Sequence, residues 1–207
     1  VKANAESIYL LISNTQASTT AEAIQGENGG KGFTTVSETV ADAQLKPSAL
    51  ATKATKDGVK ETTITDYSNV NSWYTADAID ASASDVKQDS EKKLTTFDGY
   101  VFTYTYRLTL AKGSTATTNL KVGTCTITAD GGNTIDAARV LVVCGDKTEE
   151  FKPGTTTGVV TLADSISDST VVEVKVYVYI DGNDTSIFTN NVENLDQANI
   201  TLTFVVD

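Results

Sequence analysis

The sequence predicts an all-β protein, an antiparallel β-sandwich of the jelly-roll type with an added excursion of loops and a short helix. In residues 100–110, 172–180 and 200–206, apolar and polar side chains alternate with a period of two. This pattern is typical of antiparallel strands that turn one face toward a core. The composition is also rich in Thr and Val, which favour a pleated, half-buried surface over a helix bundle.

The clearest strand covers residues 100–110. One of its faces carries only aromatic and aliphatic side chains, which are Tyr100, Phe102, Tyr104, Tyr106, Leu108 and Leu110. Shorter strands are predicted over residues 119–128, 137–144 and 158–162, because clusters of Asp, Gly, Asn and Pro separate them as turns do in sandwiches. An apolar run at residues 8–12 predicts an early strand.

The 207 residues fit one sandwich domain spanning 1–207, since no segment has the composition of a linker. Residues 42–93 differ from the rest. They show weak periodicity and contain the aromatic group Tyr67, Trp73 and Tyr74. We expect an irregular insertion laid over the sandwich.

The charge balance excludes some partners. Lys and Arg number 16 against 27 Asp and Glu, which gives a net charge of -11. The resulting field repels nucleic acid and anionic membranes. No apolar run approaches the about 18 residues of a membrane span. The sequence begins at Val1 and soon enters an apolar run, so we expect that a leader was removed and that the protein is secreted or on the cell surface.

Two cysteines, Cys125 and Cys144, each share a strand face with aliphatic residues. We expect a disulfide between them, which would close a loop of about 20 residues and contribute about 3 kcal/mol. The alternative is a pair of buried, reduced thiols that pack as small hydrophobic groups.

The sequence contains no histidine. This excludes the usual Ser-His-Asp and Cys-His nucleophile systems and imidazole zinc sites. A carboxylate pair of the glycosidase kind stays open as a third hypothesis, a hydrolase. Our expectation is that the protein is not an enzyme.

Two kinds of ligand site are predicted, for calcium and for a sugar. Asp181, Asn183 and Asp184 gather oxygen atoms in one turn, as calcium requires, and Asp130, Asn133 and Asp136 do so more loosely. These residues also suit turns without any ion, and no other cofactor is expected. Trp73 and Tyr74 could stack on a sugar, or form an apolar patch that fixes a loop.

The carboxyl-terminal region carries a family resemblance. Residues 172–180, the turn 181–185, the stretch 189–195 and the closing 199–204 together resemble the end of exported fibre subunits of Gram-positive bacteria, of the TasA and camelysin type. The resemblance implies a jelly-roll sandwich, a removed leader and polymerisation in which an extended segment of one subunit completes the sheet of the next. The protease activity described for camelysin-type proteins is not expected here, because no histidine can bind zinc.

These observations predict a structural subunit of an extracellular fibre or pilus, in a biofilm matrix or in adhesion, that self-associates by strand complementation. Residues 1–13 and 199–206 are the candidate joint strands. The alternative is a monomeric adhesin or carbohydrate-binding module, stabilised by calcium, that recognises host or matrix glycans.

Overall fold

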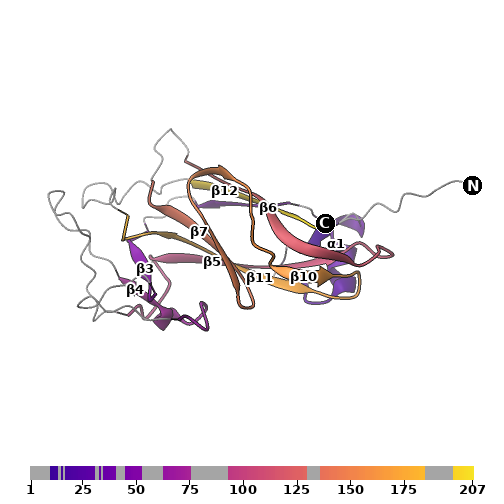
Figure 1. Cartoon of the computed structure of the whole chain (residues 1–207), viewed down its shortest axis with the longest axis horizontal. Helices are drawn as coiled ribbons and strands as arrows, with labels where there is room; N and C mark the ends of the chain where they lie inside the picture. Colours follow the sequence, from indigo (N-terminus) through magenta and orange to yellow (C-terminus); the bar gives the residue numbers. More distant parts are fainter. Residues whose placement is uncertain are drawn as a thin grey trace, which may run out of the picture.

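The computed structural model describes residues 10–13, 15, 17–30, 33, 35–40, 45–52, 63–75, 93–129, 136–184 and 198–207, and of Val40 only the backbone. These residues form two five-stranded antiparallel sheets that pack face to face (Figure 1). The predicted all-β sandwich is therefore confirmed.

Sheet 1 has the strand order β1-β5-β11-β7-β8. Its strands are β1 (Leu10–Ile12), β5 (Val101–Leu110), β11 (Val172–Ile180), β7 (Ala138–Cys144) and β8 (Lys147–Phe151). Sheet 2 has the order β10-β6-β12-β2, and β9 also pairs with β6. Its strands are β10 (Ala163–Ile166), β6 (Thr117–Ala129), β12 (Ala198–Val205), β2 (Thr35–Val40) and β9 (Gly154–Thr156).

The main core lies between the two sheets, and the apolar residues of the alternating sequence pattern form it. On β11, Val174, Val176 and Val178 are at most 2 % exposed. They belong to one apolar cluster with Ile200 and Leu202 of β12. Each such aliphatic side chain contributes about 1.5–3 kcal/mol by leaving water, so the pattern that predicts the strands also holds the sheets together.

A second apolar cluster covers the outer face of sheet 1. The segments 45–52, 63–75 and 93–100 contribute β3 (Ser48–Leu50), the 3₁₀ turn η1 (Val70–Ser72) and β4 (Trp73–Thr75). Trp73 packs its ring 5.0 Å from Tyr179 and 5.6 Å from Tyr177, between ring centroids. The indole also donates a hydrogen bond of 3.0 Å to the Tyr67 carbonyl. The described part of the predicted insertion is thus anchored through Trp73.

Helix α1 (Ala21–Gly30) lies at the end of the sandwich opposite β3 and β4 (Figure 1). Thr20 caps it, because its hydroxyl accepts from the Ala23 backbone N–H at 3.3 Å. The Gln25 side-chain amide donates to the carbonyls of Leu110 and Asp168 at 2.8 and 2.7 Å. Residues 27–29 leave helical geometry, so the ordered helix is shorter than the assigned range.

The predicted disulfide is wrong. Cys125 lies on β6 of sheet 2 and Cys144 ends β7 of sheet 1, and both thiols are free and buried. Facing sheets stand about 10 Å apart, whereas disulfide-bonded Cα atoms lie within about 7 Å. Burial raises the pKa of Cys125 to about 12, with the charge of Glu149 adding to the effect. The two thiols instead pack as small apolar groups.

The predicted strand at residues 158–162 is also not a regular strand. Between β9 and β10 the chain stays beside β6 through two hydrogen bonds, from Gly158 N to Val122 O at 3.1 Å and from Leu162 N to Leu120 O at 2.7 Å. A Cβ at Gly158 would lie 2.3 Å from the Val122 carbonyl oxygen. Only glycine allows so close a backbone approach.

Candidate functional site

The half-paired strand β5 is the most unusual feature of the sandwich. On one side, β11 pairs with residues 101–108 of β5. On the other side, β1 pairs only with residues 108–110. No described strand pairs with residues 101–106 on that second side. Within the described chain, six residues of β5 are therefore unpaired on this side, and we call this the gap.

Two backbone hydrogen bonds mark the ends of this gap. Ser13 N donates to Arg107 O at 2.8 Å, and Lys46 N donates to Gly99 O at 2.9 Å. Because backbone groups alternate in direction along a strand, Thr103 and Thr105 point their N–H and C=O groups to the same side as Arg107 O. These groups are directed into the gap. We call residues 101–106 of β5 the open stretch.

The edge of sheet 2 nearest the open stretch is β2, which pairs with β12 on one side only within the described chain. The Tyr106 hydroxyl donates to Glu38 Oε1 of β2 at 2.6 Å, so the two edges meet there. Burial and the neighbouring Glu38 raise the pKa of Tyr106 well above its ordinary value. Beside it, Phe102 and Tyr104 are half-buried, and an aromatic row therefore lines the open side of the sandwich.

The direction of β1 matters for what can fill the gap. Strand β1 begins at Leu10, which pairs with Leu110, and ends at Ile12, which pairs with Leu108. The chain therefore enters β1 at the far end of β5 and runs toward the open stretch, then turns away into α1. A straight continuation of β1 beyond Ser13 would lie along the open stretch.

Two adjoining cavities lie on the outer face of sheet 1 next to the open stretch. The smaller, of ≈ 190 Å³, is lined by Thr103, Tyr104 and Thr105 of β5, and by Ser68, Phe97, Lys175 and Tyr177. The larger, of ≈ 250 Å³, shares Ser68, Lys175 and Tyr177 and extends to Asp66, Tyr67 and Glu173. Lys175 thus borders both cavities.

Away from the open stretch, side-chain and backbone hydrogen bonds hold the sandwich together. At the far side, Glu149 of β8 accepts from the backbone N–H groups of Val159 and Val160 at 2.7 and 3.3 Å, which ties sheet 1 to sheet 2. Strand β12 pairs with β6 and with β2. Residues 199–206, one of the two candidate joint strands, are therefore already used inside the subunit.

The residues of the predicted calcium turn surround a buried arginine. Arg139 of β7 is 3 % exposed. Its guanidinium lies 2.6 Å from Asp184 Oδ2, 3.7 Å from Asp181 Oδ2 and 3.9 Å from Glu150 Oε1. Asp181 Oδ1 also accepts from Asn183 N at 3.0 Å. A guanidinium that neutralises these carboxylates takes the place that a calcium ion would need.

Among the residues that the structure describes, no group of three or more acidic or cysteine side chains is arranged to hold a metal ion. Asp130 and Asn133, from the looser predicted site, lie outside the described residues. The carbonyl of Asp136, the third member, accepts a hydrogen bond from Arg139. The arginine cluster is thus a structural clamp at the end of sheet 1.

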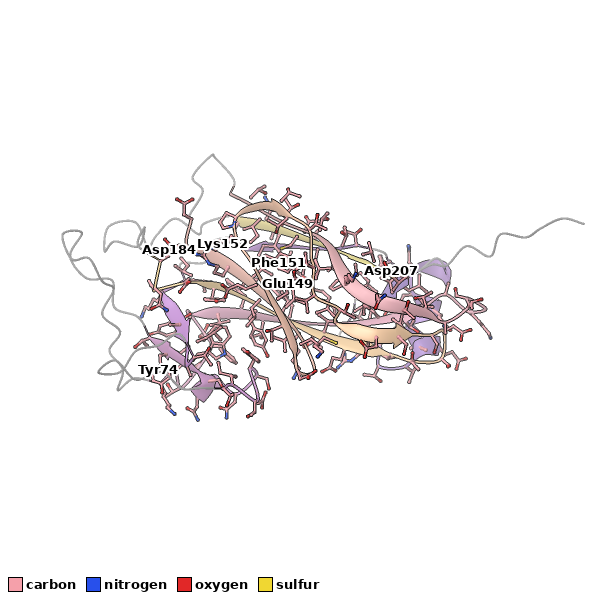
Figure 2. The ribbon with its side chains drawn as sticks, viewed as in Figure 1. Tyr74, Glu149, Phe151, Lys152, Asp184 and Asp207 are labelled. Carbon is pink, nitrogen blue, oxygen red and sulfur yellow. The ribbon has the colours of Figure 1, made fainter. Side chains whose placement is uncertain are left out.

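The two aromatic residues predicted to stack on a sugar are covered. Trp73 is 0 % exposed and Tyr74 is 8 % exposed. Lys93 places its ammonium 5.7 Å from the Tyr74 ring centroid. Figure 2 shows Tyr74 on the β3–β4 side, at the end of the molecule opposite Asp207. Both rings serve as the apolar patch that fixes a loop.

Comparisons with family models, curated proteins and solved structures found no match to this chain. In the part of the chain that is described, no helix has the length and apolar character needed to cross a membrane.

Proposed function

We propose that the protein is a structural subunit of an extracellular fibre or pilus that assembles by strand complementation at the open stretch of β5. The observation that supports this proposal is the gap of six residues beside β5, bounded by Ser13 and Lys46, which no strand in the described part of the chain fills. Unpaired N–H and C=O groups of an edge strand are a template for a strand from another chain. Main-chain hydrogen bonds make such joints strong and tolerant of sequence.

Residues 1–9 of a second copy are the proposed donor. They precede β1, and β1 begins beside Leu110, at the opposite end of β5 from the start of the open stretch. The gap is about 20 Å long, and nine extended residues reach about 30 Å. The segment is therefore long enough to fill the gap of a neighbour.

This arrangement would propagate. Donor and acceptor use different surfaces of the subunit, so the joint is heterologous, and contacts of that kind give open filaments unless the rotation closes a ring. The resemblance of residues 172–204 to TasA and camelysin-type fibre subunits supports the same function. Secretion or display on the cell surface follows from it, as does a jelly-roll classification of the sandwich.

A second candidate function is glycan binding by the monomer. The ≈ 250 Å³ cavity favours it, because Tyr67 and Tyr177 line that cavity together with Asp66 and Glu173. Sugars commonly bind between aromatic and acidic side chains. Trp73 and Tyr74 are excluded from this role by their burial.

The test uses light scattering and negative-stain electron microscopy on the whole chain and on a chain lacking residues 1–9. We expect filaments from the whole chain, and monomers from the shortened chain. A third sample, Thr103→Pro, removes one N–H of the open stretch at an edge position that tolerates proline. It should stay monomeric, whereas Thr103→Val, which keeps the N–H, should assemble.

Monomers of the whole chain at every concentration would overturn the fibre proposal. A glycan array would then test the second candidate.

A further inference from the structure

We infer that the ≈ 190 Å³ cavity beside the open stretch is a side-chain pocket of the assembly joint, in which Lys175 pairs with Glu6 of the neighbouring copy. This inference rests on the proposed function and names the contact that would give the joint its specificity. In strand addition, backbone bonds supply affinity, and pockets for alternate side chains decide which strand is accepted.

The pocket has the position that such a role requires. Thr103 and Thr105 of the open stretch form one side of it, and their direct partners on β11, Tyr177 and Lys175, form the other. Ser68 and Phe97 complete the lining. The cavity therefore lies on the outer face of sheet 1, between Lys175 and the edge where a strand would be added.

The distance suits a long acidic side chain. Neighbouring strands are about 4.8 Å apart, so an added strand would lie about 9.6 Å from β11, with β5 between them. The flexible stem of Lys175 covers part of this distance, and a glutamate on the added strand covers the rest. A serine or an alanine in that position would not reach the ammonium group.

The described acids near Lys175 are Asp66 and Glu173. Hydrogen bonds from Ser68 and, to a smaller extent, the charge of Lys175 lower the pKa of Asp66. Among the described residues, Lys175 makes no ion pair, whereas Glu173 is held by Arg107 at 3.0 Å. The Asp66 carboxylate accepts two hydrogen bonds from Ser68, at 2.9 and 2.6 Å, and is directed to that turn. Lys175 is half-buried, and no described carboxylate lies within ion-pair distance of it. An acidic side chain on an added strand would therefore gain a charge-assisted contact with its ammonium group.

The sequence of the donor supplies such a residue on the correct side. In residues 1–6, Val1, Ala3 and Ala5 alternate with Lys2, Asn4 and Glu6. The alternation ends at Ser7 and Ile8, and Glu6 is the only acid in residues 1–9. If the apolar set faces the half-buried Phe102 and Tyr104 on the inner face, the polar set faces outward. Glu6 then lies on the same face as Lys175.

A charge swap in the whole chain tests this pairing. We expect Lys175→Glu and Glu6→Lys each to raise the critical concentration for assembly about fivefold or more, which corresponds to a pair worth about 1 kcal/mol. The chain with both changes should assemble at a concentration close to that of the wild type. The penalty of each single change should become smaller between about 50 mM and 500 mM salt, because salt screens charges.

Lys152→Glu is the matched control. Lys152 is exposed and follows β8 on the other edge of sheet 1 (Figure 2), so this change should leave assembly unaltered. Lys175→Met removes the charge and keeps most of the side-chain volume. We expect its critical concentration for assembly to lie between those of the wild type and Lys175→Glu, which would show that the charge, and not misfolding, is responsible.

The outcomes distinguish a failure of the pocket assignment from a failure of the fibre proposal. If the wild type forms filaments and Lys175→Glu assembles equally well, or if the double change does not restore assembly, the pocket assignment is wrong and the fibre proposal stands. If the wild type forms no filaments, the fibre proposal fails and the pocket assignment fails with it.

Discussion

The Tyr106 hydroxyl donates a hydrogen bond of 2.6 Å to Glu38 Oε1, and through this bond β5 of sheet 1 is tied to β2 of sheet 2. The bond lies at one end of the open stretch, on the side of the sandwich where the two sheets have no other described strand between them. It joins the two sheet edges beside backbone groups of β5 that no described strand pairs with.

Replacement of Tyr106 by Phe removes the donor and keeps the ring. We expect the free energy of unfolding to fall by about 1–2 kcal/mol, because Glu38 loses a hydrogen bond at a part-buried site. Urea unfolding followed by fluorescence measures it. Tyr104→Phe is the control, since that hydroxyl has no such partner in the described structure. Equal losses for both variants would show that the bond to Glu38 contributes nothing.

Arg139 should be the most sensitive charged residue of the fold. Arg139→Met leaves the carboxylates of Glu150, Asp181 and Asp184 without their cation. We expect a loss of about 3–5 kcal/mol in the free energy of unfolding. In contrast, Lys147→Met, which removes an exposed pair with Asp146, should cost at most about 0.5 kcal/mol. A small effect of Arg139→Met would refute the clamp.

Gly158 should not tolerate even one added carbon. Gly158→Ala places a Cβ 2.3 Å from Val122 O and 2.8 Å from Val122 Cβ, so the chain must move away from β6. We expect a loss of about 2 kcal/mol or more in stability. Gly26→Ala meets nothing within 4 Å and should be neutral or stabilising by about 0.5–1 kcal/mol, since Gly26 lies within α1. Thermal unfolding of the two variants gives the comparison.

Alkaline pH should destabilise the fold through its buried tyrosines. Burial, with the charge of Asp66, raises the pKa of Tyr177 from 10.0 to about 12. Below pH 10 its contribution is fully present. Between pH 10 and 12 the unfolded chain releases this proton and the folded chain keeps it, so stability falls as the pH rises.

Tyr177→Phe should therefore make the alkaline loss less steep, by about 1.4 kcal/mol per pH unit within that window. Urea unfolding at a series of pH values measures the slopes. Other groups with raised pKa values, such as Tyr104 and Cys125, contribute equally to both proteins. Parallel slopes for the two proteins would contradict the assignment.

The two thiols should be unreactive in the folded protein and fully reactive after unfolding. Both are buried and free, and burial raises the pKa of each, so little thiolate forms near neutral pH. A thiol reagent in denaturant, without prior reduction, should count two thiols per chain. A count of zero would mean that Cys125 and Cys144 are oxidised after all.

The sequence predicts those strands of this fold that bury only one face in the main core. On β11 and β5, the period of two is set by burial of one face, and the structure has strands at both places. The same pattern does not reveal that Tyr177 and Tyr179, on the other face of β11, are also buried. They are covered by Trp73, more than 100 residues earlier in the chain, and by its neighbours in the same cluster, and no local pattern predicts this contact.

The candidate site could not have been predicted for a related reason. Nothing in the sequence around Thr103 and Thr105 distinguishes them from residues of a fully paired strand. Among the described strands, β1 pairs only with residues 108–110, and this short pairing leaves the outer backbone groups of Thr103 and Thr105 without a described partner. The disulfide prediction failed similarly, because two cysteines with apolar neighbours can lie on strands of different sheets. Edges and facing sheets depend on topology, which a periodic pattern does not encode.

Amide hydrogen exchange at the open stretch is the most direct test of strand addition at β5. Exchange of residues 101–107 is compared by mass spectrometry in dilute protein and in concentrated, filament-containing samples, with residues 174–178 of the central strand β11 as internal reference. If strand addition occurs at β5, the amides of Thr103 and Thr105 exchange fast in the monomer and become protected on assembly, while the reference stays protected in both. Filaments in which Thr103 and Thr105 still exchange fast would contradict strand addition at β5.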